Sequence, residues 1–453
     1  MPQLYRIRAG FRATLLLGAS LAAFVPAHAA SNSVTPLGSL GGNIDGYESG
    51  VSSNAVSSDG SIVVGDALLG NGNDVAFRWT QGAGMANIDT VGSTDSWSMG
   101  ISADGSVVVG AAHFNGGGGR TAFRWTQAAG MVSIDTAGDT DSEADAASAD
   151  GNVIVGWAQF NNGHYLAFRW TQATGMVNID TVGNIYSGAK AVSSDGSVIA
   201  GYAKFDGSND NAFRWTQATG MVNIDTVGGT NSQGNAVSAD GSVVVGVAQF
   251  NGGNFDAFRW TQSTGMVDLG TLGGISSWAG AVSADGKIVV GSSYVPGDTV
   301  QAAFRWTQET GTKDLNTLLS NAGVNMSGIH LDYASGISPD GKYIAGGGTF
   351  SGNIEAFLVS YIEGVTDALT TTSDVRTSVQ NLSADQRASL IESRSTAGEL
   401  LGLTRAVDNG SYSYAGAMFG SAVGYTGGQY ASRGVTILGG IAYGSEEYNN
   451  WAI

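Results

Sequence analysis

The chain has 453 residues, of which 70 are glycine, none is cysteine and 13% are charged. Its 42% apolar content is enough for a packed core, so the high glycine content does not indicate a disordered chain. The lack of cysteine excludes disulfides, thiol catalysis and cysteine-ligated metals. Acidic residues outnumber basic ones by 38 to 20, and the resulting net charge of −18 argues against a nucleic-acid partner.

The N-terminus has the pattern of an export signal. Arg6, Arg8 and Arg12 form a basic start, Ala13–Val25 is apolar, and Ala27–Ala29 supplies the small residues of a cleavage site. The alternative, a membrane-spanning helix, would need a longer apolar run. We therefore predict a signal peptide over residues 1–29, and its removal leaves 17 basic and 38 acidic residues.

One motif then recurs through the middle of the chain. Phe-Arg-Trp starts at six positions spaced 45 or 46 residues apart: Phe77, Phe123, Phe168, Phe213, Phe258 and Phe304. A seventh, altered copy is Ala356-Phe357-Leu358. A constant period of this size indicates a repeat architecture.

Each unit contains four predicted strands. In the unit around Phe258, they are Ala236–Ser238, Ser242–Val247, Ala257–Thr261 and Met266–Leu269, and Asp240-Gly241 forms the first hairpin turn. A four-stranded antiparallel unit of about 45 residues is typical of a propeller blade.

An Asp-Gly pair marks each of seven units, at Asp59, Asp104, Asp150, Asp195, Asp240, Asp285 and Asp340. The seventh unit ends at Ala356–Tyr361 without a fourth strand, whereas Thr35–Gly42 matches Val267–Gly274, the end of a complete unit. We therefore predict an all-β, seven-bladed β-propeller over residues 30–361, closed by the N-terminal strand. The alternative, an open β-solenoid, would leave that strand unused. Leu315–Val324 is predicted to form a short helix.

The composition changes after Tyr361. Residues 362–381 are predicted to be a linker, and residues 382–407 a helix with Ser383 as N-cap and Gln386 completing a capping box. Residues 408–453 alternate apolar and small side chains, which predicts the start of an incomplete β-barrel. An ordinary soluble hairpin is the alternative.

Two family resemblances follow from these motifs. Ser-Ala-Asp-Gly, Val-Val-Val-Gly, Ala-Phe-Arg-Trp and Asp-Leu-Gly-Thr-Leu-Gly-Gly resemble the HAF family of extracellular repeats over residues 35–361. The tail, through Tyr412–Gly416 to Gly439–Tyr443, resembles the start of a type V autotransporter translocator. That resemblance implies a passenger displayed at the outer membrane, although fewer than 50 residues follow Val407, too few for a complete barrel.

Residues that recur in every unit are predicted to be structural. We expect the Asp-Gly pairs to form turns, the arginine of Phe-Arg-Trp to pair with an aspartate on a neighbouring strand, and the tryptophans to lie between blades. The chain has no calcium-loop, zinc-protease, Walker or serine-elbow motif, and His113, His164 and His330 are not at equivalent positions. We therefore predict no enzyme activity, no cofactor and no metal.

Binding residues are expected where the units differ. In an up-and-down blade, the second turn and the crossover to the next blade share one face, and both vary here, whereas the first and third turns hardly vary. The predicted ligand-binding residues on that face are Trp97, Tyr165, Tyr186 and Trp278, with Asp95 and Asp139. The expected ligand is a glycan or a host surface. The alternative is unconstrained variation in the loops.

The sequence thus predicts an exported, non-enzymatic repeat passenger, displayed on a Gram-negative bacterium for adhesion or recognition. Two alternatives remain open. One is a secreted or periplasmic propeller lectin or hydrolase, and the other is a remnant autotransporter that has lost its translocator. The sequence predicts no oligomeric state.

Overall fold

The structure is a computed structural model. It describes residues 32–42 and 51–363, with gaps at 94, 115–117, 137–140, 161–162, 184–185, 228–230 and 251–252, and short strands between residues 401 and 437. The chain divides into two compact units. One comprises residues 30–369 and the other comprises residues 1–29 with 370–453.

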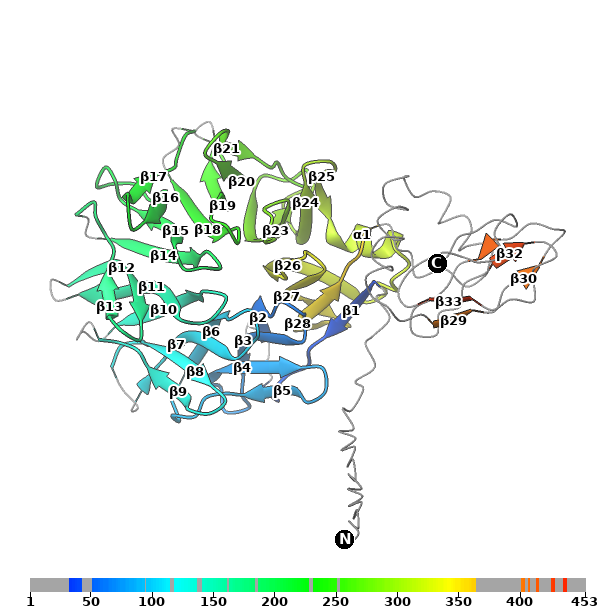
Figure 1. Ribbon diagram of the computed structural model, residues 1–453, viewed down its shortest axis with the longest axis horizontal. Coiled ribbons are helices and arrows are strands. Elements are labelled where there is room, and N and C mark those ends of the chain that lie inside the picture. Colours follow the sequence, from blue (N-terminus) through cyan, green and yellow to red (C-terminus); the bar gives the residue numbers. More distant parts are fainter. Residues whose placement is uncertain are drawn as a thin grey trace, which may run out of the picture. The chain divides into compact units, whose positions relative to one another are not determined.

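The larger unit is a seven-bladed β-propeller of four-stranded antiparallel sheets (Figure 1). Blade 1 is β2 (Val51–Val56), β3 (Ile62–Leu68), β4 (Asp74–Thr80) and β5 (Gly84–Asn87). Blade 2 is β6 (Ser96–Ile101), β7 (Val107–Ala112), β8 (Thr121–Thr126) and β9 (Gly130–Ser133). Blade 3 is β10 (Ser142–Ala147), β11 (Val153–Phe160), β12 (His164–Thr171) and β13 (Gly175–Asn178).

The next three blades repeat this order. Blade 4 is β14 (Ser187–Val192), β15 (Val198–Ala203), β16 (Asn211–Thr216) and β17 (Gly220–Asn223). Blade 5 is β18 (Ser232–Val237), β19 (Val243–Gln249), β20 (Phe255–Thr261) and β21 (Gly265–Asp268). Blade 6 is β22 (Ser277–Val282), β23 (Ile288–Tyr294), β24 (Gln301–Thr307) and β25 (Gly311–Asp314). The helix α1 (Leu315–Asn321) follows, capped by Asp314, so the predicted short helix is confirmed.

Blade 7 combines both ends of the propeller sequence. It contains β26 (Ile329–Ile337), β27 (Tyr343–Phe350), β28 (Asn353–Ser360) and β1 (Ser33–Pro36), which pairs antiparallel with β28. The backbone N–H of Leu37 donates to the carbonyl of Ala356 at 2.9 Å, and Leu269 makes the same bond to Ala257 in blade 5. The predicted closure of the ring by the N-terminal strand is therefore confirmed.

The glycine of Val-Val-Val-Gly allows the first two strands of each blade to approach. A Cβ on this residue would lie 1.8–2.0 Å from a carbonyl oxygen of the first strand in every blade. The residues are Gly65, Gly110, Gly156, Gly201, Gly246, Gly291 and Gly346. Just beyond this contact the register of the first strand shifts by one residue, as in a β-bulge.

The bulged residues form what we call the axial ring, because the first strands of neighbouring blades contact one another around the propeller axis. Three of them donate a side-chain hydrogen bond to a carbonyl of the next blade: Asn54 to Ser98 (2.8 Å), Asn235 to Ala279 (2.9 Å) and Ser335 to Ser53 (2.5 Å). Between blades 3 and 4 the ring instead contains an ion pair, with Lys190 Nζ 2.6 Å from Asp145 Oδ1.

The core lies between neighbouring blades. The seven phenylalanines of the repeat are fully buried, and the six tryptophans are 5–7% exposed, as predicted. Around Phe168, for example, Val107 and Val109 of blade 2 pack against Ile154 and Trp170 of blade 3.

The Asp-Gly turns form one face of the ring. In each turn the aspartate accepts hydrogen bonds from nearby backbone and serine groups, as Asp240 does from Ser238 and Ser242. Backbone bonds also join one turn to the next, as from Ala149 to Ser194 (3.0 Å), and the series ends at Pro339, which has no N–H. These interactions confirm the structural role of the turns.

Two arginines of the Phe-Arg-Trp motif have a different partner from the one predicted. Arg214 and Arg259 donate Nε to the carbonyls of Gly241 and Gly286 in the turn of the next blade, at 3.0 and 2.9 Å. For these two arginines the predicted aspartate partner is wrong, because a carbonyl of the turn accepts the Nε hydrogen bond. These two arginines therefore join adjacent blades through the backbone, whereas Arg305 Nη2 lies 3.5 Å from the carboxylate of Glu363.

The smaller unit contributes only short described strands. These are β29 (Leu401–Leu403), which pairs with β33 (Val435–Ile437), and β30 (Ala406–Val407), β31 (Ser413–Tyr414) and β32 (Tyr425–Gly427). The predicted helix over 382–407 is wrong at its end, because residues 401–403 and 406–407 pair with distant strands. Its residues 382–400, the predicted signal peptide (1–29) and most of the predicted linker (362–381) lie outside the described residues. Among the described helices, none combines the length and apolarity needed to cross a bilayer.

Candidate functional site

The second turn and the crossover lie on one face, which we call the variable face. At the four boundaries from blade 1 to blade 5, the residue three before the repeat phenylalanine meets the residue just before the next blade's first strand. Asp74 N thus donates to Asp95 Oδ1 (3.2 Å), Asp210 N donates to Asn231 Oδ1 (3.3 Å), and Tyr165 forms an isolated bridge with Tyr186. The predicted grouping of these two loop sets is correct.

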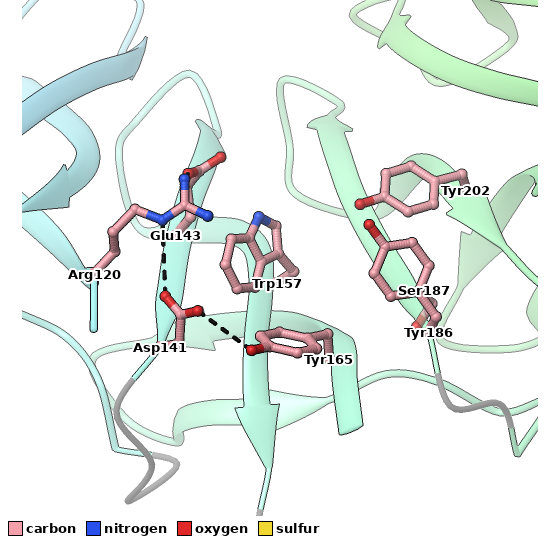
Figure 2. Close-up of a pocket in the computed structure, with 8 residues that line it drawn as sticks. All are labelled: Arg120, Asp141, Glu143, Trp157, Tyr165, Tyr186, Ser187 and Tyr202. Carbon is pink, nitrogen blue, oxygen red and sulfur yellow. Dashed lines mark hydrogen bonds and ion pairs between the residues drawn. The ribbon is translucent and has the colours of Figure 1, made fainter. Parts of the chain in front are cut away.

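A pocket of about 380 Å³ opens on this face at blades 2 to 4. We call it the interblade pocket. Eight side chains line it, drawn in Figure 2: Arg120, Asp141, Glu143, Trp157, Tyr165, Tyr186, Ser187 and Tyr202.

Serines at the start of the first strands hold the crossovers in place. The Oγ of Ser187 accepts a hydrogen bond from Ala167 N (3.0 Å) and donates one to Asp180 Oδ2 (2.8 Å). Ser142 makes the equivalent bonds in the preceding blade. The neighbouring Tyr186 and Asp141 are therefore fixed by the repeat scaffold.

One side of the pocket is charged. Arg120 Nη1 donates to Glu143 Oε2 at 2.9 Å, and Arg120 Nε lies 3.8 Å from Asp141 Oδ1. The guanidinium carbon is 5.0 Å from the centre of the Trp157 ring, within cation–π range. Glu143 is buried, and its ion pair with this arginine offsets the cost of burying the carboxylate.

Aromatic rings form the rest of the pocket. Trp157 and Tyr165 from blade 3 meet edge to face with centroids 5.4 Å apart, and Tyr186 and Tyr202 from blade 4 lie 5.6 Å apart. In Figure 2 the two pairs lie on opposite sides, with Arg120 on the far side of Trp157. Burial, reinforced by a hydrogen bond with Tyr186, raises the pKa of the Tyr202 hydroxyl, so this group stays a neutral donor.

Behind this pocket lies the ion pair of the axial ring. Burial raises the pKa of Asp145 to about 6, although Lys190 opposes the shift. Asp145 Oδ2 is buried with no hydrogen-bond partner among the described residues. Asp145 does not line the pocket, but its charge acts on Lys190 and is itself repelled by Glu143.

The predicted site residues are only partly brought together. Tyr165 and Tyr186 share the pocket. Trp97 lies in blade 2 beside His113, whose Nδ1 is 3.7 Å from Asp95, and Trp278 lies in blade 6 against Tyr294. These residues form separate clusters, and Asp139 lies outside the described residues.

The sequence prediction missed the other pocket residues. Arg120 and Asp141 lie in loops that were identified as variable, but Trp157 and Tyr202 lie inside the regular second strands β11 and β15. The available signal was the residue after the strand glycine, which is Trp157 and Tyr202 here but Ala111, Val247 or Ser292 in other blades.

A second cavity, of about 440 Å³, lies between the outer strands of blades 4 and 5. Its lining includes Arg214, Thr226 and Trp260, which recur in other blades. The cavity therefore belongs to the repeat scaffold. Within the ranges that the structure describes, no cluster of three or more histidine, aspartate or glutamate side chains is placed to hold a metal ion.

No family model and no curated protein matches the chain. Among solved structures, an oligogalacturonate lyase in complex with manganese is 13% identical, with 68% of this chain and 88% of that chain covered and a TM-score of 0.45. TolB from Agrobacterium tumefaciens is 15% identical, with coverages of 61% and 94% and a TM-score of 0.41. TolB from Acinetobacter baumannii is also 15% identical, and the match covers 53% of this chain and 60% of that one, with a TM-score of 0.38. Similarity at this level transfers no ligand and no activity.

Proposed function

We propose that this protein is an exported, non-enzymatic recognition protein that binds carbohydrate in the interblade pocket. The observation that carries the proposal is the pairing of aromatic rings on two sides of the pocket with charged and hydroxyl groups beside them. A pyranose ring has apolar C–H faces and a rim of hydroxyls. Aromatic rings pack against such faces, and carboxylate, guanidinium and phenol groups bind hydroxyls.

The arrangement supports binding rather than hydrolysis. A glycosidase of the usual kind needs two carboxyl groups with separate roles, one as acid and one as nucleophile or base. Here Glu143 accepts a hydrogen bond from Arg120, and Asp141 lies 3.8 Å from the same guanidinium, so both carboxylates are paired with one arginine rather than given separate roles. The hydrolase alternative is therefore not favoured.

For location, the proposal rests on the N-terminal signal and the autotransporter-like tail. A protein displayed at the outer membrane of a Gram-negative bacterium would act in adhesion, whereas a secreted lectin would use the same pocket in the medium. A remnant autotransporter would keep the pocket without the anchor. Fractionation of the native host separates the first of these from the other two, since only a displayed protein is recovered with outer membranes.

Binding can be tested on the mature chain. A glycan array would identify ligands, and calorimetry would compare wild type with Trp157→Ala and Tyr186→Ala. Each of these two substitutions removes an aromatic ring and should reduce the binding free energy by about 1–2 kcal/mol, or about tenfold in affinity. Trp278→Ala is the control, because it removes an aromatic side chain from the same face but in blade 6, outside the pocket. It should bind glycan with wild-type affinity. The proposal would be contradicted if the protein bound no glycan on the array, or if only the Trp278→Ala control lost affinity.

A further inference from the structure

We infer that the interblade pocket selects uncharged saccharides over acidic ones, and that the pairing of Arg120 sets this preference. The inference rests on the proposed function and specifies its ligand class. It depends on the ion pairs that the positively charged side chains around the pocket already form.

Among the residues that the structure describes, Arg120, Lys190 and Lys204 are the cations near the pocket, and each has a carboxylate partner. Arg120 contacts both Glu143 and Asp141, so the lining carries one positive and two negative charges. Lys190 is paired with Asp145 at 2.6 Å, and Lys204 lies 3.8 Å from Asp210 and donates to the carbonyl of Ser208 at 3.1 Å. The described part of the pocket thus offers no unpaired positive charge to an incoming anion.

An acidic sugar could bind Arg120 only by displacing a carboxylate. Glu143 is 6% exposed, and separating it from the guanidinium would leave a buried charge without a partner. Asp141 and Glu143 would also repel the incoming carboxylate at short range. A neutral pyranose meets neither cost, because its hydroxyls can donate to the same carboxylates while Arg120 remains in place.

The position of Arg120 strengthens this argument. Its guanidinium carbon lies over the Trp157 ring, 5.0 Å from the centroid, and in Figure 2 the tyrosines of blade 4 lie on the other side of Trp157 from Arg120. The arginine therefore supports the aromatic wall from behind. A ligand packed against the free face of Trp157 would touch the indole ring rather than the cation.

Matched sugars provide the test. The probes are the methyl glycosides of glucose, galactose and mannose, each paired with its uronic acid, which differs only in the C6 carboxylate. Affinities for the mature chain would be measured by ligand-observed NMR titration. We expect at least one neutral glycoside to bind at least tenfold more tightly than its uronate.

The variant Glu143→Gln keeps the side-chain shape but removes one charge. It should raise the ratio of uronate affinity to neutral affinity at least tenfold, whatever neutral affinity the variant keeps, and make uronate binding sensitive to salt. Asp141→Asn, at a more exposed position, should shift the preference in the same direction and covers the case in which Glu143→Gln fails to fold.

The outcomes separate the two proposals. Wild type that binds a uronate as tightly as its neutral partner overturns the selectivity while leaving carbohydrate binding intact. An unchanged preference in both folded variants removes the assigned role of Arg120 pairing. If wild type binds no probe and the glycan array is also empty, carbohydrate recognition itself is wrong.

Discussion

The seam of the ring is the pairing of β1 with β28 inside blade 7, which is closed by hydrogen bonds rather than by chain continuity, and Leu37 is buried directly after β1. It is 4% exposed and packs with Val56, Val63 and Phe77 of blade 1 and Ala356 of blade 7. Leu37→Ala removes three carbon groups, worth about 2.5 kcal/mol of burial, and leaves a cavity. The expected loss is about 2–4 kcal/mol.

That loss should appear as local opening of the seam. Because β1 has only four residues, it can detach while the six other blades stay folded. Amide hydrogens of β28 should then exchange roughly 30- to 900-fold faster, the ratio that corresponds to 2–4 kcal/mol. Hydrogen exchange followed by mass spectrometry would measure this, with blade 4 as the internal reference.

Leu269→Ala is the matched control, since Leu269 occupies the same repeat position between blades 5 and 6 and makes the same backbone bond. It should lower the urea midpoint by a similar free energy without changing exchange in β28. If Leu37→Ala accelerated exchange equally in all blades, or left β28 protected, the view of this seam as a separately opening joint would be refuted.

Three further predictions concern stability, each read by chemical or thermal unfolding. Lys190→Met should cost about 2–4 kcal/mol at pH 7.5, less than for a fully buried pair because Lys190 is 31% exposed, and adding Asp145→Asn should restore most of it. The cost of Lys190→Met should shrink below pH 6, where Asp145 takes up a proton. Gly246→Ala should cost about 3 kcal/mol or more, whereas Gly253→Ala, with 3.5 Å to its nearest neighbour, should be nearly neutral. The fold should also weaken in acid, because hydrogen bonds lower the pKa of Asp195 to about 2 from 3.8. A lowered folded-state pKa stabilises the fold above pH 3.8 and is lost as pH falls toward 2, so Asp195→Asn should flatten this decline.

Each of these has a clear contrary result. An unrestored double variant would mean that Lys190 acts through packing rather than charge. A stable Gly246→Ala would show that the two strands can separate without loss. A midpoint independent of pH between 4 and 2 would remove the role of the turn carboxylates.

Most of the propeller could be predicted because each blade repeats the same turn residues and the same pattern of apolar positions. Asp-Gly pairs fix the turns, and the alternation around Phe258 and Trp260 fixes the buried face. The Thr35–Gly42 segment, which matches the end of a unit but lacks the three strands before it, fixes the closure. The partner of Arg259 could not be predicted in this way. Strand alternation gives the side of the sheet, but the contact with Gly286 depends on how the next blade is placed.

The site was harder to predict because it depends on differences between blades. Tyr165 and Tyr186 were predicted because they are aromatic residues in segments that vary between units. Trp157 was missed because it lies in an apolar strand, where a large residue is expected to be part of the core. Trp97 and Trp278 have equally exposed-looking positions in the sequence, yet they lie in other blades. Periodicity locates the face, and only the three-dimensional structure shows which boundary holds the pocket.

The closing strand has a consequence for a chain under tension. The last propeller strand in the sequence is β28. It lies between β27 and β1 and is hydrogen-bonded to both. The backbone N–H of Ile362 also donates to the side chain of Asn32 at 2.6 Å, next to the point where the chain enters. A pull on either end of the propeller sequence therefore meets the same blade, and β28 can be drawn out only by breaking two ladders at once. The blades that hold the pocket lie across the ring and would bear none of that first rupture.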